Sequence, residues 1–248
     1  MTGMPTSSMR AHYERLLSPI YRWMLGDFTA ALERSQKELE GLGVGRAPGG
    51  ARGLDLGAGL GLQTIPLVRL GYRTTAIDTS AELLSELASE CPEAQRVCGD
   101  LLDADTLAPG TYETIVCMGD TLTHLPSQED VARLLSTACT KLALHGTLVL
   151  TFREYASQAR ESTDRFILVR ADADRILTCC LDYGTERVQV TDLVHERSAA
   201  GWTLRASAYR KLRLSREWVT EQLNRNGVMV TLSTTDAGKI SIVARRVV

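Results

Sequence analysis

The feature that most constrains the fold is a glycine-rich stretch at residues 53–61, GLDLGAGLG. Glycines alternate at positions 57, 59 and 61, and Asp55 lies two places before the first of them. Glycine is needed where the backbone adopts a positive φ or approaches a ligand closely. The stretch therefore predicts a buried strand, a tight turn and a helix whose free N–H groups face a ligand. The alternative is a strand–helix turn without a ligand, for which three alternating glycines are more than is needed.

Strands and helices alternate after this turn, which predicts a mostly parallel α/β sheet. The expected strands are residues 52–56, 72–77, 95–98, 113–118 and 147–152. A helix is expected over residues 60–70. Two more begin at capping boxes, one formed by Thr79 and Glu82 and one by Ser127 and Asp130.

The pattern changes after residue 152. Four β-like runs follow with no helix between them, at residues 165–170, 175–182, 187–196 and 202–212. They predict an antiparallel insertion, followed by a helix from Ser215 and two strands at residues 228–233 and 240–247. Residues 9–39 are expected to be helical, with a break at Pro19 and an N-cap at Asp27. The chain then divides into a helical lid and linker, an α/β core, an antiparallel substrate cap, and a C-terminal helix with a closing hairpin: residues 1–50, 51–152, 153–213 and 214–248.

The spacing of the glycines separates two classes of cofactor site. A dinucleotide site has the pattern G-x-G-x-x-G, and Leu62 occupies the place of its last glycine. The pattern present, D-x-G-x-G-x-G, resembles motif I of the class I S-adenosylmethionine (SAM) methyltransferases. That fold also ends in a hairpin on a parallel sheet. The resemblance implies a Rossmann-like class I methyltransferase sheet, with SAM as cofactor and S-adenosylhomocysteine (SAH) as product.

Acidic residues at strand ends should hold the cofactor, because ligands of open α/β sheets bind beyond the carboxyl ends of the strands. Asp78 ends the second strand and can accept both ribose hydroxyls, or else it caps the next helix. Asp100 follows the third strand and can accept from the adenine amino group, or else it is a loop acid without a partner. Asp55 either holds the glycine turn or contacts the cationic methionine end of SAM. The residues expected to contact the cofactor are Asp55, Gly57, Ala58, Gly59, Gly61, Asp78, Thr79, Asp100, Leu101 and Met118.

The loop after the fourth strand should face the methyl acceptor. It reads Gly-Asp-Thr at residues 119–121 and His-Leu-Pro at residues 124–126, and it resembles the loop of the glycine and sarcosine N-methyltransferases. His124 is the candidate general base, or else a loop residue bonded to backbone. Asp120 either orients an amine or caps the local turn.

Four further residues are candidate substrate contacts. Arg153 ends the fifth strand and can bind a carboxylate, or else it is simply exposed. Tyr13 and Tyr21 lie on the N-terminal helices, which would cover the site as a lid. The alternative is that their side chains pack in the core, which is favoured for Tyr21. Tyr183 flanks a turn of the insertion, where it lines the pocket mouth or packs across strands.

We predict no metal site. The residues after the fifth strand, Arg-Glu-Tyr at 153–155, lack the Asp-Asn pair of the metal-dependent catechol-type methyltransferases. Asp172 and Asp174 have D-x-D spacing, but between two strands this pattern is typical of a turn.

Composition limits which partners and which cellular compartment are expected. The net charge of -2 and the pI ≈ 6.1 carry no basic footprint for nucleic acid. Cys98 and Cys117 end predicted buried strands, and none of the six cysteines forms a C-x-x-C pair, which is typical of free thiols in a reducing compartment. Residues 1–8 are polar, with no secretory leader, and no run is apolar enough for a bilayer. We expect a cytoplasmic protein, either a monomer or a homodimer.

The sequence therefore predicts a SAM-dependent methyltransferase that acts on a nitrogen or an oxygen of a small molecule, with nitrogen favoured. A non-catalytic SAM-binding regulatory protein and a methyltransferase acting on a protein remain alternatives. A nucleotide-dependent oxidoreductase is disfavoured by Leu62 in the glycine pattern.

Overall fold

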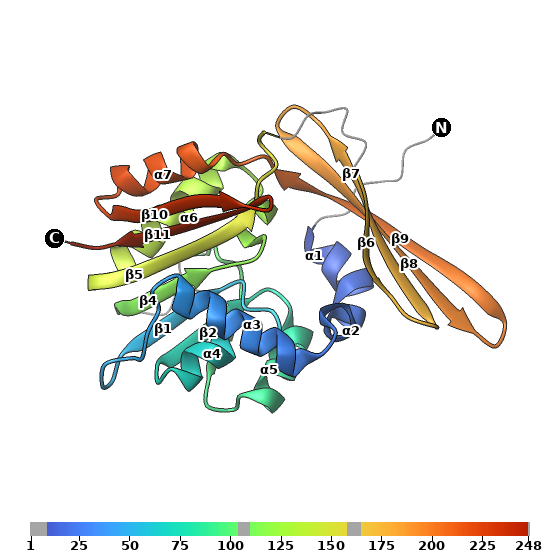
Figure 1. The fold of residues 1–248 in the computed structure, drawn as a ribbon, viewed down its shortest axis with the longest axis horizontal. Coiled ribbons are helices and arrows are strands. Elements are labelled where there is room, and N and C mark those ends of the chain that lie inside the picture. Colours follow the sequence, from blue (N-terminus) through green and yellow to red (C-terminus); the bar gives the residue numbers. More distant parts are fainter. Residues whose placement is uncertain (1–8, 104–109, 158–164, 248) are drawn as a thin grey trace.

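The structure is a computed structural model that describes residues 9–103, 110–157 and 165–247. Two β-sheets, one of seven strands and one of four, enclose a short helical segment from the N-terminal part of the chain (Figure 1). The leader-free start expected at residues 1–8 lies outside the described residues.

The seven-stranded sheet has the order β10-β11-β5-β4-β1-β2-β3. Strands β1 to β5 are parallel, and the hairpin β10–β11 is antiparallel to β5. The predicted α/β sheet with a closing hairpin is thereby confirmed. Its strands are β1 (Arg52–Leu56), β2 (Arg73–Asp78), β3 (Gln95–Cys98), β4 (Tyr112–Cys117), β5 (Leu142–Arg153), β10 (Met229–Asp236) and β11 (Lys239–Arg245).

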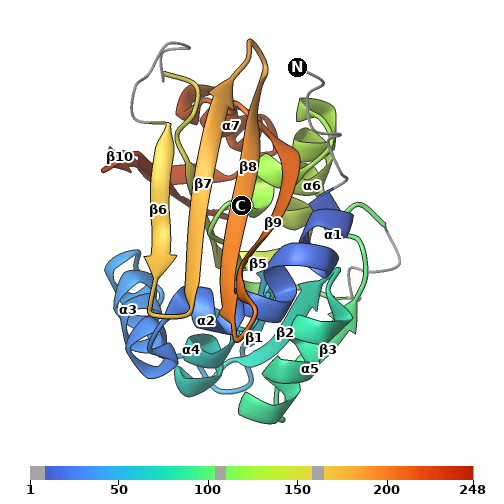
Figure 2. The same cartoon turned by 90° about the vertical axis from the view of Figure 1, so that its right-hand side faces the viewer.

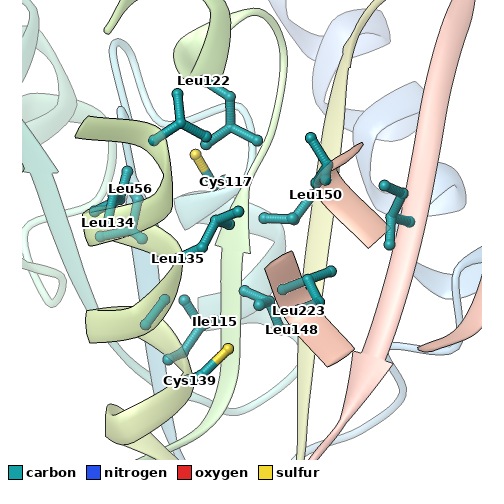
Figure 3. Packing of buried hydrophobic residues seen from close by; sticks show 14 of the residues in the cluster. Leu56, Ile115, Cys117, Leu122, Leu134, Leu135, Cys139, Leu148, Leu150 and Leu223 are labelled. Carbon is teal, nitrogen blue, oxygen red and sulfur yellow. The ribbon is translucent and has the colours of Figure 1, made fainter. Parts of the chain in front are cut away.

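Helices cover both faces of this sheet, because its central strands are buried on both sides. Successive side chains of β4 point to opposite faces. Ile115 and Cys117 pack with residues of α6 and α7 (Figure 3), whereas Val116 packs with residues of α3 and α4. The helices are α3 (Phe28–Gly41), α4 (Thr64–Arg69), α5 (Ala81–Glu90), α6 (Gln128–Lys141) and α7 (Arg216–Arg225).

Most helix starts lie where the sequence predicts them. The side chains of Asp27, Ser127 and Ser215 each accept a hydrogen bond from a backbone N–H in the first turn of their helix. The predicted cap at Thr79 is wrong by one residue. Ser80 caps α5 instead, and its hydroxyl accepts from the N–H of Leu83.

The helix after the glycine turn also differs from the prediction. It begins at Thr64 rather than at residue 60. Gly57, Gly59 and Gly61 all have positive φ, at 82°, 52° and 88°. Three residues in the left-handed region cannot belong to a right-handed helix, so the turn extends through the third glycine before α4 can start.

The predicted antiparallel insertion is the four-stranded sheet, with the order β6-β7-β8-β9. Asp172 closes its first turn, since its Oδ1 accepts from the N–H groups of Asp174 and Arg175 at 2.9 and 2.8 Å. The D-x-D spacing is therefore a turn, as predicted. The strands are β6 (Phe166–Ala171), β7 (Arg175–Tyr183), β8 (Arg187–Ser198) and β9 (Gly201–Leu212).

The N-terminal segment lies between the two sheets, behind β8 and β9 in the view of Figure 2. It breaks near Pro19, as predicted, into a series of short helical turns. Leu16 and Ile20 of this segment pack against Leu177 and Val194 of the four-stranded sheet. The segment comprises α1 (Met9–His12), a π-helical turn (Tyr13–Leu17), a 3-10 turn (Ser18–Ile20) and α2 (Tyr21–Leu25).

Arg213 ties together the two ends of the insertion. Its guanidinium donates to the carbonyl oxygens of Tyr155, Ala156 and Gly184 at 2.9, 3.0 and 2.6 Å. The chain therefore leaves the core after β5 and returns to it before α7 through one hydrogen-bonded neck.

The cysteines are free, and Cys117 is buried as predicted. Cys98 is exposed, contrary to the prediction, because β3 is an edge strand of the sheet. In the ranges that the structure describes, no helix is both long and apolar enough to cross a membrane.

Candidate active site

A cavity of about 1080 Å³ lies between the two sheets. One side consists of the glycine turn and the loops at the carboxyl ends of β2, β3, β4 and β5. The other side consists of inward-facing residues of β6 to β9, and the N-terminal segment borders both. The cavity thus lies where ligands of open α/β sheets bind, with a second sheet closing its far side.

The glycine turn forms one edge of the cavity. Gly57, Ala58 and Gly59 line it. A Cβ atom at Gly57 would lie 2.4 Å from Oγ1 of Thr121, and one at Gly59 would lie 3.9 Å from the ring of Tyr21. A side chain at Gly57 would collide with Thr121, so this glycine allows the loop after β4 to pack against the turn, whereas the space beside Gly59 is free on the cavity side.

Gly61 does not line the cavity in the part of the chain that the structure describes, although the sequence suggested a cofactor contact. A Cβ atom there would lie 2.4 Å from Cδ1 of Leu87. The third glycine therefore allows α5 to pack closely against the turn.

Asp78 lines the cavity and also fixes the turn. Its Oδ2 accepts from the N–H of Gly59 at 2.8 Å, and its Oδ1 accepts from the N–H of Ser80 at 2.8 Å. Burial raises the pKa of this carboxyl, and the backbone donors oppose the shift. The side chain is held in one orientation at the end of β2, beside Thr79, which also lines the cavity.

Asp55 lies behind the turn and, among the described residues, does not line the cavity. Its Oδ2 accepts from Oγ1 of Thr64 at 2.6 Å, rather than from N–H groups of the glycines. Burial raises its pKa to about 7, and the bond from Thr64 opposes the shift. The predicted bonds to the glycine turn are therefore wrong, since Asp55 anchors the start of α4, whereas a contact with the methionine end of SAM stays a prediction.

The end of β3 supplies the other acidic candidate. Asp100 and Leu101 line the cavity, as does Met118 after β4. The Oδ1 of Asp100 accepts from the N–H of Leu102 at 2.9 Å, so this acid has a partner in its own loop. Two carboxylates and a bare glycine backbone along one edge fit a nucleoside carrying hydroxyl and amino donors, as SAM does.

Asp120 forms a buried ion pair. Nζ of Lys211 on β9 donates to its Oδ2 at 2.5 Å, and the N–H of Arg153 donates to its Oδ1 at 2.8 Å. Burial alone would raise the pKa of this carboxyl, but the charge and hydrogen bond of Lys211, together with His124 and the N–H of Arg153, outweigh it, and the pKa is lowered to about 2. The Asp120 side chain does not cap the following 3-10 turn at Thr121–His124.

His124 lines the cavity, and its pKa is lowered to about 3, by burial first and then by Lys211. Its Nε2 is buried and has no hydrogen-bond partner in the described part of the chain. The rings of Tyr13 and Tyr209 flank it, with centroids 5.8 and 5.6 Å away. The imidazole is therefore neutral at ordinary pH, and its Nε2 is left for a hydrogen bond to a ligand.

Three of the four predicted substrate contacts reach the cavity: Tyr13 and Tyr21, which are half-buried, and Arg153, which is exposed. Tyr183 is absent from its described lining. It packs against Tyr155 in the loop after β5, with ring centroids 6.3 Å apart, so this contact is not a cross-strand one.

The sequence reasoning missed the inward-facing polar residues of the insertion. Asp192 on β8 and Tyr209 and Lys211 on β9 line the cavity. One signal was available: Asp192 interrupts an alternating apolar series in which Val190 and Val194 are buried. A buried acid at an inward position of a strand needs a partner or a function.

In the described ranges no cluster of three metal-binding side chains occurs.

Comparison with known sequences identifies the core. Residues 54–146 match the family described as "Methyltransferase domain". The chain is 26% identical over 111 residues to a glycine/sarcosine N-methyltransferase of Aphanothece halophytica, a match covering 43% of this chain and 42% of the relative. It is 30% identical over 132 residues to a ubiquinone biosynthesis O-methyltransferase of Methylococcus capsulatus, covering 52% of each. The matches span only 21% to 52% of the length of these and a third curated relative.

Comparison with solved structures extends the likeness to the whole chain. The SAM-bound amino pentose methyltransferase of Micromonospora echinaspora superimposes with a TM-score of 0.76 at 16% identity, over 94% of this chain and 97% of that one. This likeness concerns the fold, and together with the domain match it supports SAM as the cofactor. Residues 54–146 therefore match a methyltransferase domain, and the chain has the Rossmann-like fold of the solved SAM-dependent methyltransferases.

Proposed function

We propose that the protein is a SAM-dependent methyltransferase that acts on a small molecule. The observation that carries the proposal is the single cavity that joins the glycine turn to a polar chamber under the four-stranded sheet. An acceptor in that chamber would be enclosed together with the cofactor and shielded from water, as methyl transfer requires. The names of the relatives given above refer to glycine, sarcosine, an amino pentose and ubiquinone biosynthesis. These names support a small molecule as the methyl acceptor.

The residues divide into a cofactor half and an acceptor half. The backbone at Gly57 and Gly59 and the carboxylates of Asp78 and Asp100 would hold the nucleoside, with Thr79, Leu101 and Met118 beside it. SAM supplies an electrophilic methyl group on a sulfonium. The protein's own task is to hold the acceptor atom in line with that methyl group and to remove water and the acceptor's proton.

We assign the removal of the acceptor's proton to His124. It is neutral, buried and unpartnered at Nε2 within the described residues. An amine that is already neutral needs no base, whereas a hydroxyl does. Relatives of both kinds are known, and we favour nitrogen because the loop at residues 119–126 is similar to that of the N-methyltransferases.

The first experiment is a calorimetric titration with SAM and SAH, with NADH as the control. We expect micromolar binding of SAM and SAH and no binding of NADH. Transfer of labelled methyl from SAM to a panel of amines, amino acids and phenols then tests catalysis. Failure to bind SAM would overturn the proposal. Binding without transfer to any small molecule, but with transfer to protein, would reassign the acceptor.

A further inference from the structure

The chamber under the four-stranded sheet contains one buried acid that the proposed function leaves unassigned. Asp192 points inward from β8, lines the cavity and is 5% exposed. Its Oδ2 accepts from Nε2 of His12 on α1 at 2.9 Å, and the charge of the same carboxylate helps to raise the pKa of the Cys179 thiol on β7, after burial. His12 is itself fully buried, at 0% exposure.

The other acids of the cavity are accounted for. Asp78 and Asp100 accept from backbone N–H groups on the cofactor side, and Asp120 is neutralised by Lys211. Asp192 has no lysine or arginine within ion-pair distance among the described residues; its recorded ion-pair partner is the imidazole of His12. A carboxylate has about four acceptor positions, so the bond from His12 leaves it able to accept more.

The surroundings of Asp192 indicate the kind of molecule that would supply the missing donors. Inward-facing Leu177, Leu181 and Val190 form an apolar wall, and Tyr209 lies beside His12 with ring centroids 4.2 Å apart. A carboxylate in an apolar wall selects a ligand with a cationic or N–H group on an apolar or cyclic frame. A plain alcohol would supply only one neutral donor.

We propose that Asp192 binds the amino group of the methyl acceptor, and that the acceptor is therefore a basic amine. His12 acts as a positioning residue, because its hydrogen bond sets the rotamer of the carboxylate. This inference rests on the proposed function and adds the acceptor class to it. The competing explanation is structural, with the His12–Asp192 bond serving only to tie α1 to the sheet.

Matched pairs of probes separate the acceptor classes. Cyclohexylamine is compared with cyclohexanol, and glucosamine with glucose, by calorimetry on the SAH-loaded protein and by methyl transfer from labelled SAM. We expect the wild-type protein to bind at least one amine about tenfold more tightly than its alcohol, the effect of a charge-assisted hydrogen bond. If no amine binds better than its alcohol while SAM still binds, the inference fails and the proposed function stands.

The variant Asp192→Asn keeps the shape of the side chain and an oxygen that can accept from His12. We expect it to raise KM for the preferred amine about tenfold or more and to abolish the preference over the alcohol, with SAM affinity unchanged. Asp182→Asn is the matched control, because Asp182 is an exposed acid on the neighbouring strand β7. It should change none of these values.

Three results would overturn the role of Asp192. One is an unchanged amine preference in Asp192→Asn. Another is a loss of SAM affinity in that variant, which would place the acid in the cofactor half. The last is a lowered melting temperature with normal KM for the amine, which is the structural explanation. If the variant does not fold, the preference of the wild-type protein for amine over alcohol still decides the acceptor class.

Discussion

The Asp78 side chain supports the glycine turn and is also expected to bind the cofactor. Its carboxylate holds the backbone of Gly59 and faces the cavity. We expect Asp78→Ala to weaken SAM binding on the order of 1.5–3 kcal/mol for each hydrogen bond lost to the ribose. Calorimetry measures the effect, with Glu82→Ala as control, since Glu82 is an exposed acid at the start of α5 that does not line the described cavity. Unchanged affinity would mean that the cofactor lies elsewhere.

His124 should affect turnover and not cofactor affinity. We expect His124→Ala to lower kcat, by on the order of 10²-fold if the acceptor needs a base. Because the pKa of His124 is lowered to about 3, its titration should leave no step near pH 6.5 in kcat/KM of the wild-type protein. Normal turnover of the variant with an accepted substrate would remove His124 from the proton transfer.

Asp55 gives the folded state a pH dependence of definite sign. Its pKa rises from 3.8 unfolded to about 7 folded because the carboxyl is buried. Its stabilising contribution is full below pH 3.8 and is lost as the pH rises through about 7. The loss is on the order of 4 kcal/mol. Urea unfolding of wild type and Asp55→Asn across this window should show the difference; parallel curves would contradict the assignment.

Among the elements, the glycine turn is the most constrained by its neighbours. Gly61→Ala places a methyl group against Leu87 as well as straining a φ of 88°. We expect a loss of about 1–3 kcal/mol in the free energy of unfolding, from overpacking as well as strain. Gly227→Ala is the matched control, with a φ of 74° and no atom within 4 Å of the added Cβ. Equal losses in the two variants would leave strain as the whole cause.

The elements also mark how far sequence reasoning reaches. Strand order and most caps follow from local signals, as at Ser127 and Ser215. Thr79 and Ser80 both suit an N-cap, and only the path of the backbone after β2 decides between them. The start of α4 moved to Thr64 because the sequence pattern does not reveal that Gly61 also takes a positive φ.

In the candidate site too, local sequence signals predict some residues and miss those that meet only in the folded protein. Asp78, Asp100 and Asp120 follow strands, so a parallel sheet brings them to one edge, and they could be predicted. Lys211 meets Asp120 across 91 positions of sequence, and Asp192 meets His12 across 180. Such pairs form only when the insertion folds over the core, and no local pattern records that.

At the level of the whole molecule, we expect the N-terminal segment, which borders the cavity, to move when product leaves. Its short α, π and 3-10 turns pack between the sheets, away from the main core. We expect amides of residues 9–25 to exchange hydrogen faster than those of β4 and β5, and to slow when SAH is added. Protection equal to that of the core strands in the SAH-free protein would rule out the lid.

The neck at Arg213 has a consequence for how such proteins diversify. Both ends of the four-stranded sheet leave the core at one point, held by three hydrogen bonds to Tyr155, Ala156 and Gly184. The strands that would recognise the acceptor are therefore one uninterrupted segment, separate from the strands that carry the glycine turn. Exchange of that segment between relatives would replace the insertion's share of the cavity wall and leave the glycine turn in place.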